Sequence, residues 1–120
     1  MTGEEMQKID AAVQAHGQWL GRLRTAIDKG TSEFQPEVVR LDNRCDFGKW
    51  LYGEFPASLK ATPAFEEIRG LHAKFHQAAG QILSLALGGK KGDALKLMEP
   101  TGEFMTLSGN LVLRLKRLKG

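Results

Sequence analysis

The sequence predicts an all-α protein, an antiparallel bundle of the four-helix type with one short helix that carries the single cysteine. Two long segments repeat apolar residues at alternating steps of three and four, which is the spacing of one helix face. A third segment repeats a large apolar residue every seven positions. No segment alternates apolar and polar residues as a half-buried strand does. The length of 120 residues predicts one domain over residues 1–120.

The first helix is expected over residues 3–29, and Gly30 is expected to end it. Its stripe steps by three and four through Met6, Ile9, Val13, His16, Leu20, Leu23 and Ile27. His16 occupies a position of this stripe, so its side chain is expected to face the core. Taken alone, a histidine at such a position is most often a core residue with an ordinary hydrogen-bond partner.

A short helix is expected from about Arg44 to Gly53, with Asp42 or Asn43 as its capping residue. Cys45 would lie in the first turn, where the main-chain N–H groups favour a thiolate. Three apolar residues at helical spacing would pack this helix against the bundle: Phe47, Trp50 and Leu51. The segment between Pro56 and the next long helix is expected to be irregular or briefly helical.

The third helix is expected to start at Thr62-Pro63, a capping residue followed by proline at the first helical position, and to stop at Gly88-Gly89. Its stripe steps by three and four through Phe65, Ile68, His72, Phe75, Ala79, Ile82 and Ala86. His76 lies beside this stripe, four residues after His72, so the two imidazoles share a helix face one turn apart.

The last helix is expected to begin near Gly92-Asp93 and to be kinked or interrupted at Pro100. Its seven-residue repeat runs through Leu97, Phe104, Leu111 and Leu118. The basic end, LRLKRLKG, is interpreted as a solvated helix terminus whose cations suit the helix dipole. Nucleic-acid binding is not expected, because the net charge is only +3 and no interleaved aromatics or reader motif are present.

The three histidines and the one cysteine of this chain form a complete ligand set for one metal ion. Three neutral imidazoles and a thiolate make a closed tetrahedral zinc site. The positions of the histidines along the two long helices allow them to share one level of the bundle. We therefore expect Zn²⁺ to be held by His16, Cys45, His72 and His76, because burying three imidazoles without partners would be costly.

Other chemistries suit the sequence less well. A di-iron carboxylate bundle needs Glu-x-x-His pairs, but Arg69 and Ala73 stand three residues before the paired histidines. A catalytic zinc keeps an open position and a general base, and HAKFH lacks the glutamate of such a site. No oxyanion donor or orienting group can be named for a Cys–His nucleophile. No enzyme is expected, and the remaining alternative is a metal-free structural bundle for protein interaction.

The segment around the cysteine, RCDFGKWLYG, resembles the C-x-F-G-x-W-L signature of the chemoreceptor zinc-binding (CZB) domain family. The segments HGQWL and HAKFH resemble the other two ligand segments of that family, in the same order. The resemblance spans roughly residues 9–80. It implies a homodimeric helical bundle that binds zinc through three histidines and one cysteine, which here are His16, Cys45, His72 and His76.

The same resemblance implies a function in bacterial signalling. Such domains are attached to cytoplasmic chemoreceptor signalling regions or to diguanylate cyclases. It implies zinc sensing and, in some members, oxidant sensing through the zinc-bound cysteine. At 120 residues the chain is expected to be a sensor domain without an output domain, either an excised piece or a module that acts on a partner.

Composition and cysteine usage predict the setting. The chain is 42% hydrophobic and 26% charged, which is ordinary for a globular domain. A single cysteine excludes an intrachain disulfide, and the polar N-terminus lacks a hydrophobic signal segment. No apolar run approaches the length of about 18 residues that a membrane span requires. We therefore expect a cytoplasmic protein without membrane insertion.

Overall fold

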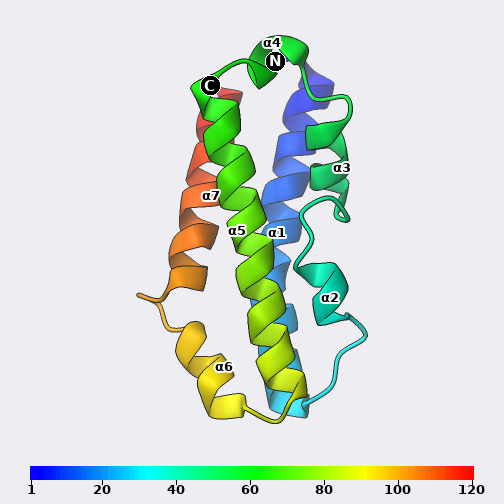
Figure 1. The fold of residues 1–120 in the computed structure, drawn as a ribbon. Coiled ribbons are helices and arrows are strands. Elements are labelled where there is room, and N and C mark those ends of the chain that lie inside the picture. The colour runs from blue at the N-terminus through cyan, green and yellow to red at the C-terminus, as the bar shows by residue number, and fades with distance from the viewer.

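The computed structural model describes all residues, 1–120, and contains helices but no strand. The helices are α1 (Gly3–Lys29), α2 (Pro36–Val39), α3 (Asp46–Tyr52), α4 (Ala57–Lys60), α5 (Pro63–Leu87), α6 (Lys91–Leu97) and α7 (Glu103–Lys119). They form four columns that alternate in direction: α1, then α2 with α3, then α5, then α6 with α7 (Figure 1). The predicted all-α bundle is confirmed; the second column consists of two short helices, and the fourth is divided into the short α6 and the longer α7.

The ends of the long helices follow from local capping. The Thr2 hydroxyl accepts a hydrogen bond from the Glu5 N–H, and the Glu5 carboxylate accepts one from the Thr2 N–H, which forms a capping box. Gly30 ends α1 in the left-handed conformation with a φ of 72°. At the start of α5 the Thr62 hydroxyl accepts from the Phe65 N–H. The predicted boundaries of α1 and α5 are confirmed.

The buried face of α1 is broader than one heptad stripe. Ala12, Trp19 and Ala26 are buried, whereas the stripe residues Val13 and Leu20 are only half-buried. The reason is that α1 packs against α5, α7, α3 and α6, and neighbours on several sides need more than one row of apolar residues. On α5 the predicted stripe is buried along its whole length, together with His76, Gly80 and Leu83.

Two local predictions differ from the structure. The short helix begins at Asp46, and Cys45 itself is the capping residue in place of Asp42 or Asn43. The second difference is α2, a single turn that starts at Pro36 and was not predicted. The predicted interruption at Pro100 is confirmed, because α6 ends at Leu97 and α7 starts at Glu103.

The glycines inside the long helices fall into two groups. A Cβ on Gly17, Gly21 or Gly70 would meet no atom within 4 Å, so these positions are simply tolerated on open surfaces. A Cβ on Gly80 would lie 3.1 Å from the main chain of Arg40, at the end of α2. Gly80 therefore allows α2 to approach α5 closely.

None of the helices combines the length and the apolar character needed to cross a membrane.

Candidate metal centre

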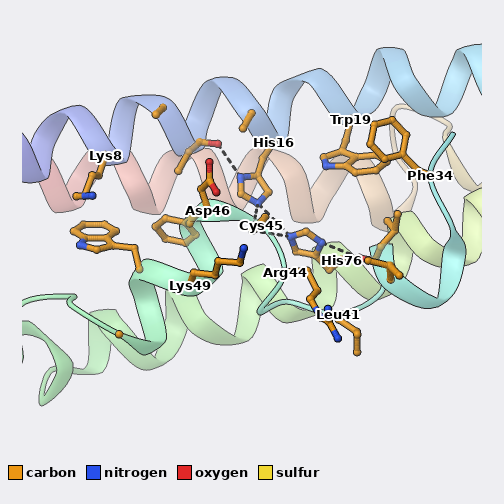
Figure 2. A pocket seen from close by; sticks show the side chains of 18 of the residues that line it. Lys8, His16, Trp19, Phe34, Leu41, Arg44, Cys45, Asp46, Lys49 and His76 are labelled. Atoms are coloured by element: carbon orange, nitrogen blue, oxygen red, sulfur yellow. Dashed lines mark hydrogen bonds between the residues drawn. The ribbon is translucent and has the colours of Figure 1, made fainter.

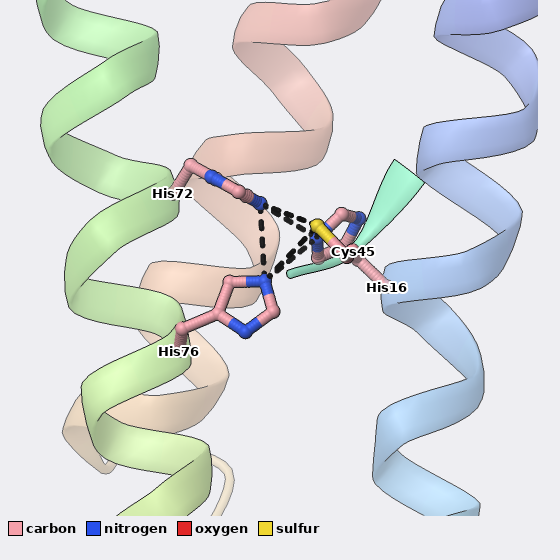
Figure 3. A group of neighbouring side chains, drawn as sticks. All are labelled: His16, Cys45, His72 and His76. Carbon is pink, nitrogen blue, oxygen red and sulfur yellow. Dashed lines mark hydrogen bonds between the residues drawn. The ribbon is translucent and has the colours of Figure 1, made fainter. Parts of the chain in front are cut away.

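The four predicted ligands converge at one point inside the bundle (Figure 3). His16 projects from the middle of α1, and His72 and His76 project from the first half of α5. Because α1 and α5 run in the same direction, these histidines stand at the same level (Figure 1). Cys45 reaches the same point from the N-terminal end of α3. Three separate segments of the chain thus contribute to one cluster.

The distances between the four ligand atoms match a tetrahedron around one zinc ion. The Nε2 atoms of the three histidines lie 3.0, 3.1 and 3.3 Å apart. The Cys45 Sγ lies 3.3, 3.5 and 3.9 Å from the Nε2 atoms of His72, His76 and His16. A tetrahedral zinc ion has bonds of about 2.3 Å to sulfur and about 2.0–2.1 Å to nitrogen. These bonds place sulfur about 3.5 Å from each nitrogen and the nitrogens about 3.3 Å from one another.

The protonation of the imidazoles shows why these atoms need a cation between them. The His16 Nδ1 lies 2.7 Å from the Ala12 carbonyl oxygen, and the His76 Nδ1 lies 2.9 Å from that of Val39. A carbonyl only accepts, so both Nδ1 atoms carry protons and both Nε2 atoms carry lone pairs. These two lone pairs face each other across 3.3 Å. The His72 ring and the Cys45 thiol cannot supply protons for all six contacts among the three Nε2 atoms and the sulfur. One cation at the centre would instead accept a lone pair from each of the four ligand atoms.

His72 differs from the other two histidines, because no hydrogen bond to the main chain orients its ring. Its Nδ1 is buried and has no hydrogen-bond partner. The ring of Phe47 lies edge-on to it, with ring centroids 5.0 Å apart. Metal-binding histidines usually donate the second ring N–H to an acceptor. In this protein His16 and His76 follow that rule through main-chain carbonyls, and His72 does not.

Burial sets the protonation of the cluster at neutral pH. It lowers the pKa of His16 to about 4, and it also lowers the pKa of His72 and of His76, although the hydrogen bond to Val39 opposes the shift of His76. The imidazoles are therefore neutral and present lone pairs. Burial raises the pKa of the Cys45 thiol, and the Gly48 N–H partly offsets this rise. Without a metal the cysteine is a thiol near pH 7, so metal binding displaces its proton.

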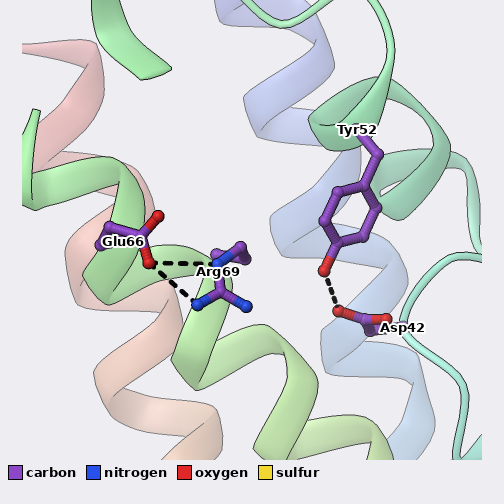
Figure 4. A network of polar contacts seen from close by, with 4 residues as sticks. All are labelled: Asp42, Tyr52, Glu66 and Arg69. Carbon is purple, nitrogen blue, oxygen red and sulfur yellow. Dashed lines mark hydrogen bonds and ion pairs between the residues drawn. The ribbon is translucent and has the colours of Figure 1, made fainter. Parts of the chain in front are cut away.

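The sharp turn before α3 brings Cys45 to the cluster. The main chain of Asp42 and Asn43 passes so close to Gly48 that a Cβ on Gly48 would collide with the Asp42 carbonyl. The Tyr52 hydroxyl donates a hydrogen bond to the Asp42 carboxylate (Figure 4). This bond joins the two ends of residues 42–52, which we call the cysteine segment. On the neighbouring α5 turn, Arg69 forms an ion pair of 2.9 Å with Glu66.

The geometry and the donor set define a zinc-type centre, and a family comparison agrees with it. The family model described as "Chemoreceptor zinc-binding domain" matches residues 16–83, a span that begins at His16 and includes the other three cluster residues. The chain belongs to the chemoreceptor zinc-binding domain family. This CZB family is regulatory and sensory, and the cluster fits Zn²⁺ as its cofactor. No curated protein and no solved structure matched the chain.

Sequence reasoning found all four cluster residues and missed the groups that orient them. The acceptors for His16 and His76 are the main-chain carbonyls of Ala12 and Val39, and any residue type supplies a carbonyl. Ala12 could have been found, because it stands four residues before His16 on the same helix. Val39 lies on α2, and no sequence pattern indicated that this turn would reach the cluster.

Proposed function

We propose that this CZB domain is a zinc-dependent sensor in which His16, Cys45, His72 and His76 bind one Zn²⁺. The observation that carries the proposal is the set of six distances between the four ligand atoms, all of tetrahedral size. Bound zinc supplies a fixed positive charge that holds the cysteine as a thiolate. The histidines supply the permanent part of the site, since each is buried on a long helix.

Cys45 is proposed as the ligand that dissociates when the signal arrives. Its side chain is half-buried, whereas His16, His72 and His76 are between 0% and 3% exposed. It also belongs to a helix of only seven residues. Two signals can act on this sulfur: a change in available zinc, and a two-electron oxidant that converts the thiolate to a sulfenic acid and is itself reduced.

Release of Cys45 would change the packing of α3. Phe47 packs against the rings of His16 and His72, and Trp50 packs against Phe55 with ring centroids 4.8 Å apart. Both aromatic residues follow the cysteine on the same short helix. A displaced sulfur would therefore move Trp50, which makes its fluorescence a direct report on the switch.

The output of the sensor is proposed to lie in another protein or domain. We infer that residues 1–120 act as one cytoplasmic sensor domain, as a homodimer, on bacterial signalling proteins such as chemoreceptors or diguanylate cyclases. Membership of the CZB family supports a signalling role. A light-scattering measurement of molar mass, with and without zinc, tests the dimer.

The test of the sensor proposal is a zinc titration of the metal-free protein. A Trp19→Phe variant leaves Trp50 as the only tryptophan. We expect saturation at one zinc per chain by elemental analysis, a change in Trp50 fluorescence and a higher melting temperature by circular dichroism. Cys45→Ala in the same background should bind zinc more weakly and lose the fluorescence change. A protein that binds no zinc would instead be a metal-free structural bundle.

A further inference from the structure

A cavity of about 920 Å³ lies beside the metal centre, between α1 and the segment that contains α2 and α3 (Figure 2). His16, Cys45 and His76 line it, and His72 does not. We call this cavity the cysteine groove. Cys45 is the one cluster residue that is half-buried, so the groove gives access to its sulfur. Alanines on α1 leave the space open on that wall: Ala11, Ala12 and Ala15.

The charged side chains of the cysteine groove are mostly cationic. Two cations come from α1 and two from the cysteine segment: Lys8, Arg22, Arg44 and Lys49. The anions that line it are Asp46 and Glu54. The groove therefore concentrates an excess of two positive charges around the cysteine, whereas the whole chain carries only +3.

None of the four cations of the groove forms an ion pair with an acidic side chain of the protein. The ion pairs of the structure are Arg69–Glu66, Arg114–Glu67 and Lys119–Asp10, and none involves a groove residue. Arg22 stacks over Trp19 and Phe34 at 5.0 and 4.9 Å, and Lys8 lies 5.9 Å from the centre of the Trp50 ring. Such aromatic contacts fix the position of a cation and leave its charge in place.

We propose that the cysteine groove is the route by which reagents reach Cys45, and that it selects small anions over neutral molecules of similar reactivity. The proposal rests on the proposed function, because it names the class of molecule that acts on the same sulfur. A cleft lined by one sign of charge between low-dielectric walls raises the local concentration of the opposite ion. Anions that react with a thiolate or accept its metal would therefore arrive faster.

The test compares two disulfide reagents, because Cys45 is the only cysteine and so gives the whole signal. One is the dianionic 5,5′-dithiobis(2-nitrobenzoate), and the other is the neutral 4,4′-dithiodipyridine. In each reaction the Cys45 sulfur attacks a reagent sulfur, forms a mixed disulfide and releases the other half as a thiolate. We divide the second-order rate constant of the anionic reagent by that of the neutral reagent, which removes differences in the thiolate fraction of Cys45. We expect this ratio to fall as salt is added, because salt screens the attraction of the anionic reagent.

Charge reversal on the two walls of the groove gives the decisive comparison. In Lys8→Glu/Lys49→Glu, the ratio of anionic to neutral rate constants should fall by about tenfold. The control, Lys91→Glu/Lys96→Glu, changes the net charge equally on α6, far from the groove (Figure 1). Its ratio should stay close to that of the unchanged protein. An unchanged ratio in the groove variant, or an equal fall in the control, would overturn the proposal.

Zinc content separates this proposal from the sensor function. Each variant is first loaded with zinc and its metal content measured, and the rates are then taken with and without the metal. Normal zinc binding with no charge effect on the ratio would refute the anion route alone. Absence of zinc binding would refute the sensor function, and the ratio for the metal-free protein would still decide whether the groove selects anions.

Discussion

The main-chain N–H of Gly48 donates a hydrogen bond of 3.3 Å to the sulfur of Cys45. The same glycine lies where the main chain of Asp42 leaves no room for a Cβ. One residue thus both supports the sulfur and permits the turn that delivers it. This explains in physical terms why the cysteine motif places a glycine three residues after the cysteine.

Gly48→Ala should therefore weaken zinc binding. The new Cβ would force the main chain of residues 42–43 away, and a displacement of that kind costs roughly 1–3 kcal/mol. We expect the zinc affinity to fall by about tenfold to a hundredfold, measured by competition with a chromophoric chelator. Gly70→Ala is the matched control, because Gly70 lies inside α5 and an added Cβ would contact no other atom within 4 Å. It should leave the affinity unchanged and stabilise the protein by about 0.5–1 kcal/mol.

Cys45→Ala should reduce zinc affinity while the helices remain intact. The cysteine caps a seven-residue helix and is only half-buried, so the core formed by α1, α5 and α7 does not depend on it. Far-UV circular dichroism of the metal-free variant should match that of the unchanged protein. If the variant were unfolded both with and without zinc, Cys45 would be mainly a core residue.

Zinc binding at pH 7 should release about one proton per ion. Burial keeps the Cys45 thiol protonated and the three imidazoles neutral before the metal binds, so only the thiol loses a proton. Isothermal titration calorimetry in two buffers of different ionisation enthalpy measures this number. Cys45→Ala should release none. A release of two or more protons would show that the imidazoles are charged in the metal-free protein.

The metal-free protein should lose stability as the pH falls below about 6.5. Burial lowers the folded-state pKa of all three histidines, so the unfolded chain takes up their protons at higher pH than the folded chain does. For His16 the loss continues down to its folded pKa of about 4. Each imidazole contributes a slope of roughly 1 kcal/mol per pH unit. Urea unfolding at several pH values measures the slope, and His72→Leu should reduce it; equal stability at pH 7 and pH 5 would contradict this mechanism.

The sequence predicts the parts of this protein that side chains specify. His16 and His72 stand on apolar stripes, and a stripe fixes the direction of every residue on it. Thr62 and Gly30 mark helix ends through interactions within a few residues. Such local signals place the histidines on known faces at known heights, which is sufficient to predict that they meet.

The remaining features depend on main-chain groups that meet only in the folded protein. α2 is one turn long, and its position is set by the close approach of Arg40 to Gly80 and by the hydrogen bond from His76 to the Val39 carbonyl. Cys45 replaces Asp42 or Asn43 as the cap because the tight turn puts its sulfur, and not their side chains, above the Gly48 N–H. The sequence pattern carries no sign of either arrangement.

X-ray absorption at the zinc K-edge tests the metal centre most directly, on protein that holds one zinc per chain. The four ligands converge on one point, so we predict one sulfur neighbour at about 2.3 Å and three nitrogen neighbours at about 2.0–2.1 Å. The sulfur signal should disappear in Cys45→Ala. A first coordination sphere of nitrogen and oxygen alone, or one with six neighbours, would contradict the assignment of His16, Cys45, His72 and His76 as the zinc ligands.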